Sequence, residues 1–359
     1  MVRVRVVKGT PSVELSKRAF GEKFRARFYD PDFNQAQEPI DQLLDIAWKT
    51  YIDYHKSPRT RRAGAGFADP DAELPTEWLK ARADIRAAER RHRNRASPSR
   101  ILVINGSARS DQTCPGEMSK TLRLVQLARN IIESRHRFDV EVLDLSRIVS
   151  EYGRMIYPCK ACVSTAMPLC HWPCSCYPNH AIGQVNDWMA EIYPMWVAAH
   201  GIMIICPVNW YQAPSVLKLM IDRLVCADGG NPDPTSTRGK DPKRAKMLEL
   251  KGWDYPRHLA GRVFSVVVHG DAAGVEALRR NLTDWLTDMG LIRAGNKAVV
   301  DRYIGYYAAY ATSHDDLDRD TDFQEEVRNA ARSLVEAVRL MRSGKLPQPD
   351  ARLHEARPK

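Results

Sequence analysis

Short β-branched apolar runs alternate with longer segments of helical periodicity from Arg100 onward, and this alternation limits the possible folds more than any other feature. The predicted strands are 101–105, 140–145, 202–206, 263–269 and 298–300, and the predicted helices are 119–134, 186–200, 215–226, 275–289 and 323–342. Fully apolar runs are typical of parallel strands with helices on both faces. The sequence therefore predicts an α/β fold with a doubly wound, five-stranded parallel sheet.

The segment before this pattern differs in character. Residues 1–98 are rich in arginine and Pro-Asp turns and predict a mainly helical extension, with one helix behind Pro39 and another from Thr76 to near Arg95. The α/β domain is expected over 99–345, with a cysteine-rich loop at 157–180, a long loop at 227–258 and a flexible tail at 346–359. Aromatic residues in both N-terminal helices favour packing on the same domain or on a second subunit, so we expect a homo-oligomer, a dimer or tetramer.

Charge and composition restrict the location and the partners. No stretch approaches the roughly 18 to 20 apolar residues that span a bilayer, and the N-terminus lacks the apolar block of a signal peptide, so we expect a cytoplasmic protein with no membrane partner. The net charge of +10 is compatible with nucleic acid, membrane lipid or phosphorylated cofactors. Arg59, Arg61, Arg62 and the run 90–95 could contact nucleic acid. No recognised nucleic-acid module accompanies them, so that reading is disfavoured.

The loop after the first predicted strand has the composition of a phosphate site. It reads NGSARSDQTCPGEMSKT over 105–121, and Gly106 allows a sharp turn off the strand. Hydroxyl and guanidinium donors surround the predicted helix start: Ser107, Arg109, Ser119 and Thr121. Such donors, with the backbone N–H groups of a helix N-terminus, complement a phosphate dianion. The Walker and G-x-G-x-x-G motifs are absent, and an ordinary solvated loop with capping serines is the alternative.

The segment after the third predicted strand offers flat apolar groups. Asn209, Trp210 and Tyr211 follow a buried strand directly, and an aromatic cofactor needs such faces together with backbone donors. The alternative is that the two aromatic side chains simply cover the edge of the sheet.

The first-strand loop N-G-S-x-R-S and the segment PVNWYQAPSVLKLMIDR at 207–223 together resemble the NADPH-dependent FMN reductase and iron–sulfur flavoprotein branch of the flavodoxin-like superfamily. The resemblance covers about half of the chain and implies a flavodoxin-like fold, FMN as cofactor and NAD(P)H as electron donor. It places the FMN phosphate on Ser107, Arg109, Ser119 and Thr121. It places the ribityl chain and ring on Pro207, Val208, Asn209, Trp210, Tyr211 and Ser215, and a flavin-contacting turn at His269 and Gly270. For His269, an ordinary structural role is the alternative to proton transfer.

Five cysteines lie close together after the second predicted strand: Cys159, Cys162, Cys170, Cys174 and Cys176. Iron–sulfur flavoproteins carry a cysteine motif at the corresponding place, which implies a 4Fe–4S cluster on four of these thiols. Zinc is the competing metal, because it takes similar ligands. Free or redox-active thiols are the third alternative, since the spacing departs from the tighter family motif.

The predicted function is transfer of electrons from NADPH or NADH through FMN to a small-molecule acceptor, of the quinone, azo, nitro or metal-oxyanion class. No side chain stands out as a catalytic acid or base. Two other functions stay open: a flavodoxin-like electron carrier without its own substrate, and a basic nucleic-acid- or partner-binding protein. The long segments outside the flavin domain favour an enzyme over a carrier.

Overall fold

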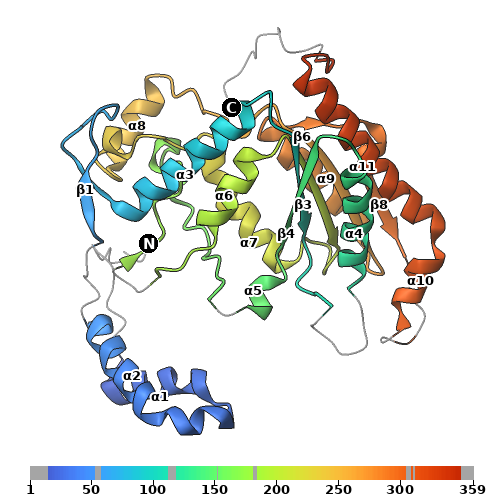
Figure 1. The fold of residues 1–359 in the computed structure, drawn as a ribbon. Helices are drawn as coiled ribbons and strands as arrows, with labels where there is room; N and C mark the ends of the chain where they lie inside the picture. The colour runs from blue at the N-terminus through green and yellow to red at the C-terminus, as the bar shows by residue number, and fades with distance from the viewer. Residues whose placement is uncertain are drawn as a thin grey trace, which may run out of the picture. The chain divides into compact units, whose positions relative to one another are not determined.

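The computed structural model describes residues 15–52, 58–111, 119–151, 153–180, 184–304, 309 and 312–348 (Figure 1). Contacts divide the chain into two compact units. The first comprises residues 1–58 with 179–185, and the second comprises residues 59–178 with 186–359.

The first unit contains two helices, α1 (Lys17–Arg25) and α2 (Gln37–Ile52), with 3-10 turns at Ala26–Phe28 and Pro31–Ala36. Ser16 caps α1 by accepting a hydrogen bond from the Ala19 N–H. The ring of Phe20 lies 4.8 Å from that of Tyr51, and Ile40 and Leu44 are buried. Aromatic contacts between the helices therefore hold this unit together, and the helix predicted behind Pro39 is confirmed.

The second unit contains the parallel sheet. Its strands are β3 (Ser99–Asn105), β4 (Phe138–Asp144), β5 (Gly201–Pro207), β6 (Val263–Gly270), β7 (Ile292–Arg293) and β8 (Val299–Tyr303). The order is β4-β3-β5-β6, and both β7 and β8 pair with β6. The strand order reverses beside β3, as in flavodoxin-like sheets. The predicted fold class is confirmed.

The predicted count of five strands is wrong, because two short strands, β7 and β8, pair with the outer edge of β6 where one strand was predicted. β7 pairs with the beginning of β6, at Val263 and Phe264, and β8 pairs with the rest of it, from Val266 to Gly270. Gly295, with φ 131°, and a 3-10 turn at Asn296–Ala298 lie between the two short strands. A two-residue strand is too short to show a periodic pattern, so the sequence showed only β8.

Helices cover both faces of the sheet. α4 (Lys120–Glu133) and α11 (Thr321–Arg342) lie together on one face, and Figure 1 shows them side by side. α6 (Met189–Ala198), α7 (Ser215–Arg223) and α9 (Val275–Asp288) cover the other. A hydrophobic core lies on each face of the sheet, and alternate residues of β3 point into one or the other. Ile101 and Val103 pack towards α4 and α11, while Leu102 and Ile104 pack towards α6 and α7. The helices predicted between the strands are confirmed.

Part of the predicted N-terminal extension belongs to the second unit. β1 (Thr60–Arg62) and β2 (Glu73–Pro75) form an antiparallel hairpin that leads into α3 (Thr76–Arg93), and α3 packs on α6. The Trp78 indole donates to the Pro173 carbonyl (2.8 Å), and the Ala68 N–H donates to Asp233 (2.6 Å). Residues 59–93 are thus joined to the cysteine-rich loop and to the loop at 227–258, which contains α8 (Pro242–Leu250).

Two short helices complete the second unit, α5 (Arg147–Ser150) and α10 (His314–Arg319). Within the part of the chain that the structure describes, no helix combines the length and apolar character needed to cross a membrane.

Candidate functional site

The loop after β3 is organised by a buried asparagine. Asn105 ends the strand with its side chain inside the protein; its Nδ2 donates to Asp144 Oδ1 (2.7 Å), and its Oδ1 accepts from the Ser107 N–H (3.1 Å). Ser107 Oγ accepts in turn from the Arg109 N–H (3.1 Å). These bonds fold the chain back immediately after the strand, where the sequence predicted a phosphate loop.

Gly106 lets this loop lie directly on β5. A Cβ atom at this position would be 2.7 Å from Cys206 Cβ and 2.9 Å from Leu217 Cδ2, closer than real Cβ contacts allow. The Gly106 N–H donates to the Ile205 carbonyl (2.8 Å). A larger residue would lift the loop away from the sheet, so this position requires glycine.

The hydroxyl groups predicted at the start of α4 are buried. Ser119 is the N-cap and accepts from the Leu122 N–H (3.3 Å), and Thr121 lies in the first turn. Thr121 Oγ1 is 2.9 Å from His269 Nε2, so the end of β6 contacts this helix start. Burial, with Lys120 in its surroundings, lowers the pKa of His269 to about 3, and the imidazole is therefore neutral near pH 7. The intervening residues 112–118 lie outside the described residues.

The segment after β5 forms a tight turn that presents two aromatic side chains. Reciprocal backbone hydrogen bonds of 2.9 Å join Asn209 and Gln212. Trp210 (φ 45°) and Tyr211 (φ 65°) occupy the left-handed region between them, which is rare for bulky residues. Their side chains are 91% and 59% exposed. A conformation of this kind costs about 1–3 kcal/mol per residue and is typical of ligand-binding segments.

Neighbouring backbone supports this turn from β6. The Val208 N–H donates to the His269 carbonyl (2.9 Å), and a Cβ at Gly270 would be 2.9 Å from Val208 Cγ1. Gly274 (φ 102°) precedes α9, and a Cβ there would be 2.8 Å from Tyr211 Cα. The loops after β5 and β6 are therefore in close contact.

These features meet at one edge of the sheet. Asn105 pairs with Ile205, and Pro207 pairs with His269, so the carboxyl ends of β3, β5 and β6 are neighbours. Ligands of doubly wound sheets bind at this edge, where the strand order reverses. Of the remaining predicted residues, Pro207 is half-buried and Ser215 is exposed at the first position of α7. The site thus combines buried hydroxyl groups at a helix N-terminus with exposed aromatic faces, which suits a ligand that carries both a phosphate and a flat ring.

The cysteine-rich loop is fastened to the other end of α7. Arg223 is the last residue of α7. Its guanidinium donates to the Tyr157 carbonyl (2.9 Å) and forms a buried ion pair with Asp187 (2.6 and 3.0 Å). Cys159 lines a cavity of about 480 Å³ with Val225 and Met289. Since α7 begins beside the aromatic turn, its nine residues separate the two regions by roughly 12 Å.

The predicted metal ligands lie in a chain of neighbouring thiols. Cys162 interacts with Cys170 and with Cys176, and Cys176 interacts with Cys174. Hydrogen bonds from Cys162 and Cys174, together with Lys240, hold the pKa of Cys176 well below its usual value. Among the residues that the structure describes, no three of these Sγ atoms lie mutually within 4.8 Å. The fifth predicted ligand, Cys159, is half-buried in the cavity beside α7.

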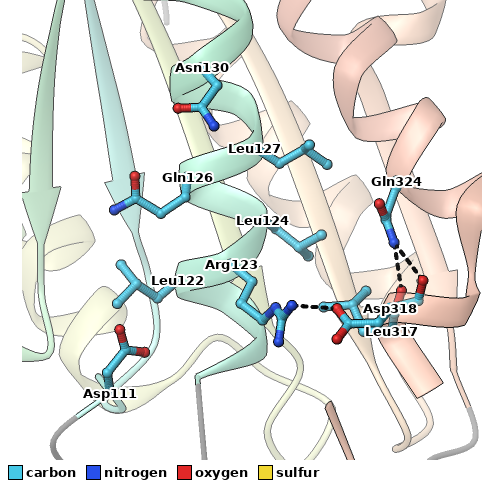
Figure 2. Close-up of a pocket in the computed structure, with 10 residues that line it drawn as sticks. All are labelled: Asp111, Leu122, Arg123, Leu124, Gln126, Leu127, Asn130, Leu317, Asp318 and Gln324. Atoms are coloured by element: carbon cyan, nitrogen blue, oxygen red, sulfur yellow. Dashed lines mark hydrogen bonds and ion pairs between the residues drawn. The ribbon is translucent and has the colours of Figure 1, made fainter. Parts of the chain in front are cut away.

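A further cavity of about 350 Å³ lies beside α4, outside the predicted site (Figure 2). Arg123 of α4 forms an ion pair with Asp318 of α10 (2.7 Å), and Gln324 of α11 donates to the Leu317 and Asp318 carbonyls. Asp111 is the lining residue from the loop after β3. None of the predicted cofactor-binding residues lines this cavity, so it borders the phosphate loop without belonging to the predicted site.

Three residues of these regions were not identified from the sequence. Asn105 organises the phosphate loop, Gly274 makes room for the aromatic turn, and Lys240 contacts two of the thiols. A polar residue that ends an otherwise apolar strand was a visible signal for Asn105. The other two depend on contacts between distant segments and carry no local signal.

The fold and the strand-end site define a flavodoxin-like α/β protein built to hold a phosphorylated aromatic cofactor. A family model described as NADPH-dependent FMN reductase matches residues 99–304. The match covers more than half of the chain, so the protein belongs to the NADPH-dependent FMN reductase family and is an NAD(P)H-dependent FMN oxidoreductase.

Solved structures with a similar fold share little sequence with this chain. RosB with the bound intermediate 8-demethyl-8-formylriboflavin-5'-phosphate is 12% identical, with a TM-score of 0.45 over 69% of this chain and 81% of that chain. A flavone reductase is 16% identical (TM-score 0.38; 67% of this chain, 63% of that chain). FerB, a flavoenzyme NAD(P)H:(acceptor) oxidoreductase from Paracoccus denitrificans, is 13% identical (TM-score 0.37; 67% and 97%). No curated protein matches the chain. These distant likenesses carry no functional argument.

Proposed function

We propose that the site at the carboxyl ends of β3, β5 and β6 binds FMN and that the bound flavin carries electrons from NADPH or NADH to a small acceptor of the quinone, azo, nitro or metal-oxyanion class. One observation carries the assignment of the residues. Two exposed aromatic side chains are held in an unfavourable backbone conformation beside buried hydroxyl groups at a helix N-terminus. A turn that only covered the sheet edge would gain nothing from this strain.

The residues present fit FMN. Ser107, Ser119 and Thr121 supply hydroxyl groups around the α4 N-terminus, and Arg109 supplies a guanidinium, so these side chains would hold the phosphate. Trp210 and Tyr211 would lie against the ring, with the backbone of Val208 and Asn209 beside it. The flavin itself would supply the redox chemistry, as an acceptor of hydride and a donor of electrons.

The chain's own contribution is binding and orientation. Neutral His269 holds the Thr121 hydroxyl rather than delivering a proton, because its pKa is about 3. The Trp210 side chain is exposed to solvent, so a small acceptor could reach a ring bound beside it, and an aromatic acceptor could stack there. The seven described cysteines are free thiols, which supports a cytoplasmic location.

An iron–sulfur cluster or a zinc ion is a separate prediction, and the spacing of the thiols does not fit a single zinc ion. Zinc at about 2.3 Å from four sulfurs would separate neighbouring sulfurs by about 3.8 Å. Among the described residues no three sulfurs are mutually within 4.8 Å, and the Lys240 ammonium donates to two of them. We therefore derive no electron-transfer step through a metal centre.

The phosphate assignment is tested by comparing FMN with riboflavin, which lacks the phosphate. A charged hydrogen bond contributes about 1.5–3 kcal/mol, so Arg109→Ala should weaken FMN binding about 10- to 100-fold and leave riboflavin binding unchanged. Flavin fluorescence quenching on the apoprotein measures both affinities. Arg129→Ala is the matched control, because Arg129 forms only an exposed ion pair with Glu133 on α4. An equal effect on both flavins, or none, would contradict the assignment.

Turnover with NADPH or NADH then separates an enzyme from a carrier. An enzyme should reduce at least one acceptor class in steady state, with the flavin bound throughout. If the protein binds FMN tightly but reduces only redox proteins, the electron-carrier alternative is correct instead.

A further inference from the structure

A cavity of about 460 Å³ lies at the opposite end of the sheet from the predicted FMN site. Its lining comes from the end of α3 and from residues 257–262, which lead directly into β6. The strands are parallel, so this is the amino end of β6, whereas the predicted FMN site lies at the carboxyl ends of the strands. The eight residues of β6 separate the two places by roughly 25 Å.

Guanidinium groups dominate the lining of this cavity. Arg93 comes from α3, and Arg257 and Arg262 come from the loop before β6. Among the described residues that line the cavity, Glu89 is the only acidic one. Arg93 is exposed and Arg257 is half-buried, and within the described part of the chain neither side chain forms an ion pair or a hydrogen bond. Three cations thus line one cavity with a single carboxylate to balance them.

Arg262 is a buried cation, with only 4% of its surface exposed. Its Nε donates to the Trp196 carbonyl (3.2 Å) and its Nη2 to the Val197 carbonyl (2.6 Å), in the last turn of α6. Two longer bonds of 3.4 Å reach carbonyls of its own loop. These carbonyls supply only partial negative charge. No described carboxylate forms an ion pair with Arg262, although buried charges are normally paired. The side chain therefore lacks a full counter-charge, which an anion in the cavity would provide.

The positive charge of the cavity comes from arginine alone. Burial lowers the pKa of His92 to about 4 and also lowers the pKa of His258, so both imidazoles are neutral near pH 7. One nitrogen of each ring lies against a backbone carbonyl (2.9 and 2.8 Å), and the rings stack on His200 and Trp172. The two histidines are thus fixed walls of the cavity.

We propose that this cavity is a second ligand site, which binds a small phosphorylated molecule by its phosphate. Arg93, Arg257 and Arg262 would hold the phosphate, because a guanidinium group matches phosphate oxygens with two parallel hydrogen bonds. The volume of about 460 Å³ is in the range of small-molecule pockets and leaves room for more than the phosphate itself. This inference goes beyond the proposed redox function and uses none of its residues.

A phosphate suits the arrangement better than a carboxylate does. The arginine side chains come from a helix and from a separate loop, and the three terminal oxygens of a phosphate can accept from several directions. A carboxylate offers two oxygens in one plane. A small molecule also suits the cavity better than a nucleic-acid strand, because Arg262 is buried and only a group that enters the cavity can reach it.

Calorimetric titration with inorganic pyrophosphate tests the proposal. The full chain is loaded with one equivalent of FMN, which occupies the loop after β3, and the ionic strength is held constant without divalent cations. We expect one pyrophosphate to bind per chain. Citrate, which also carries several negative charges but on carboxylates, should bind at least about 10-fold more weakly.

Variants of the two accessible arginines locate the bound anion. Arg93→Gln and Arg257→Gln should each weaken pyrophosphate binding about 10-fold or more, because each removes a charged hydrogen bond. Arg90→Gln is the matched control, since Arg90 is exposed on the same helix but does not line the cavity, and it should bind as the wild type does. Arg262 is left unchanged, because it also holds the end of α6.

Three results would overturn the proposal. One is an absence of saturable pyrophosphate binding, and another is an equal loss of affinity in Arg90→Gln and Arg257→Gln. The third is displacement of pyrophosphate by an oligonucleotide without terminal phosphates, which would assign these arginines to nucleic acid. Arg109→Ala separates the two sites of the chain: it should leave pyrophosphate binding unchanged. If it abolished that binding instead, the anion would lie in the loop after β3, and this inference would fail while the predicted FMN phosphate site stood.

Discussion

His269 ends a central strand with its side chain almost wholly buried, and this burial limits what the residue can do. A histidine that donates protons near pH 7 needs a pKa close to that value, whereas burial lowers the pKa of His269 to about 3. The proton-transfer role considered from the sequence is therefore unfavourable. Its contact with Thr121 at 2.9 Å instead makes it a positioning residue for the predicted phosphate loop.

His269→Gln should weaken FMN binding without changing how activity depends on pH. Loss of a buried hydrogen bond costs about 1–3 kcal/mol, and part of that cost should appear as a several-fold weaker FMN affinity. The profile of kcat/KM between pH 5.5 and 8 should keep its wild-type shape, because the imidazole does not titrate there. Disappearance of an ionisation near pH 6.5 in the variant would show that His269 does transfer a proton.

The turn after β5 and the loop after β6 act as one element, and Gly274 is where they touch. Gly274→Ala would place a methyl group 2.8 Å from Tyr211 Cα, so the aromatic turn would have to move. Gly295→Ala is the matched control, because it also has positive φ but a Cβ there meets nothing within 4 Å. Both changes strain the backbone by about 1–3 kcal/mol, and only the first should also weaken FMN binding.

Flavin titration and urea unfolding of the two variants measure these effects separately. The two variants should lose similar amounts of unfolding free energy, and only Gly274→Ala should lose FMN affinity. That result would support the view that the turn after β5 and the loop after β6 act together. If Gly295→Ala weakened FMN binding equally, the effect would come from general destabilisation and the contact would be irrelevant.

Elements with strong local patterns could be predicted from the sequence, and elements defined by distant contacts could not. The apolar runs of β3, β5 and β6 are buried on both faces, so their composition alone marked them. The strand Thr60–Arg62 is fully exposed and polar, and it exists only because it pairs with Glu73–Pro75. The junction of Trp78 with Pro173 likewise joins residues 95 positions apart.

The same distinction holds for the candidate sites. Gly106 and the aromatic pair were visible because each lies directly after a buried strand, where sheet topology brings loops together. The arrangement of the cysteines was not predictable, because spacing along a loop does not determine how far apart the sulfurs lie. Lys240, which contacts two of them, is contributed by a different loop.

At the scale of the whole molecule, buried histidines make stability depend on pH. His171, His200 and His269 are each 2% exposed, and burial lowers their pKa values to about 4, 3 and 3. In the unfolded chain these groups titrate near 6.5. Between about pH 6 and pH 4, therefore, the unfolded state binds protons that the folded state does not. The contribution that these neutral, buried histidines make to the free energy of unfolding is fully present above pH 6.5 and is lost as the pH falls.

Each such histidine removes about 1.4 kcal/mol of unfolding free energy per pH unit, so the three together should remove about 4 kcal/mol between pH 6 and pH 5. This is a large part of the roughly 5–15 kcal/mol that stabilises a typical protein. Urea unfolding followed by tryptophan fluorescence at closely spaced pH values measures the slope. His200→Gln should lower the slope by about one proton, whereas His136→Asn, at an exposed position, should leave it unchanged. A constant unfolding free energy from pH 6.5 to pH 5 would mean that these imidazoles are protonated in the folded protein, and the neutral role assigned to His269 would fail with it.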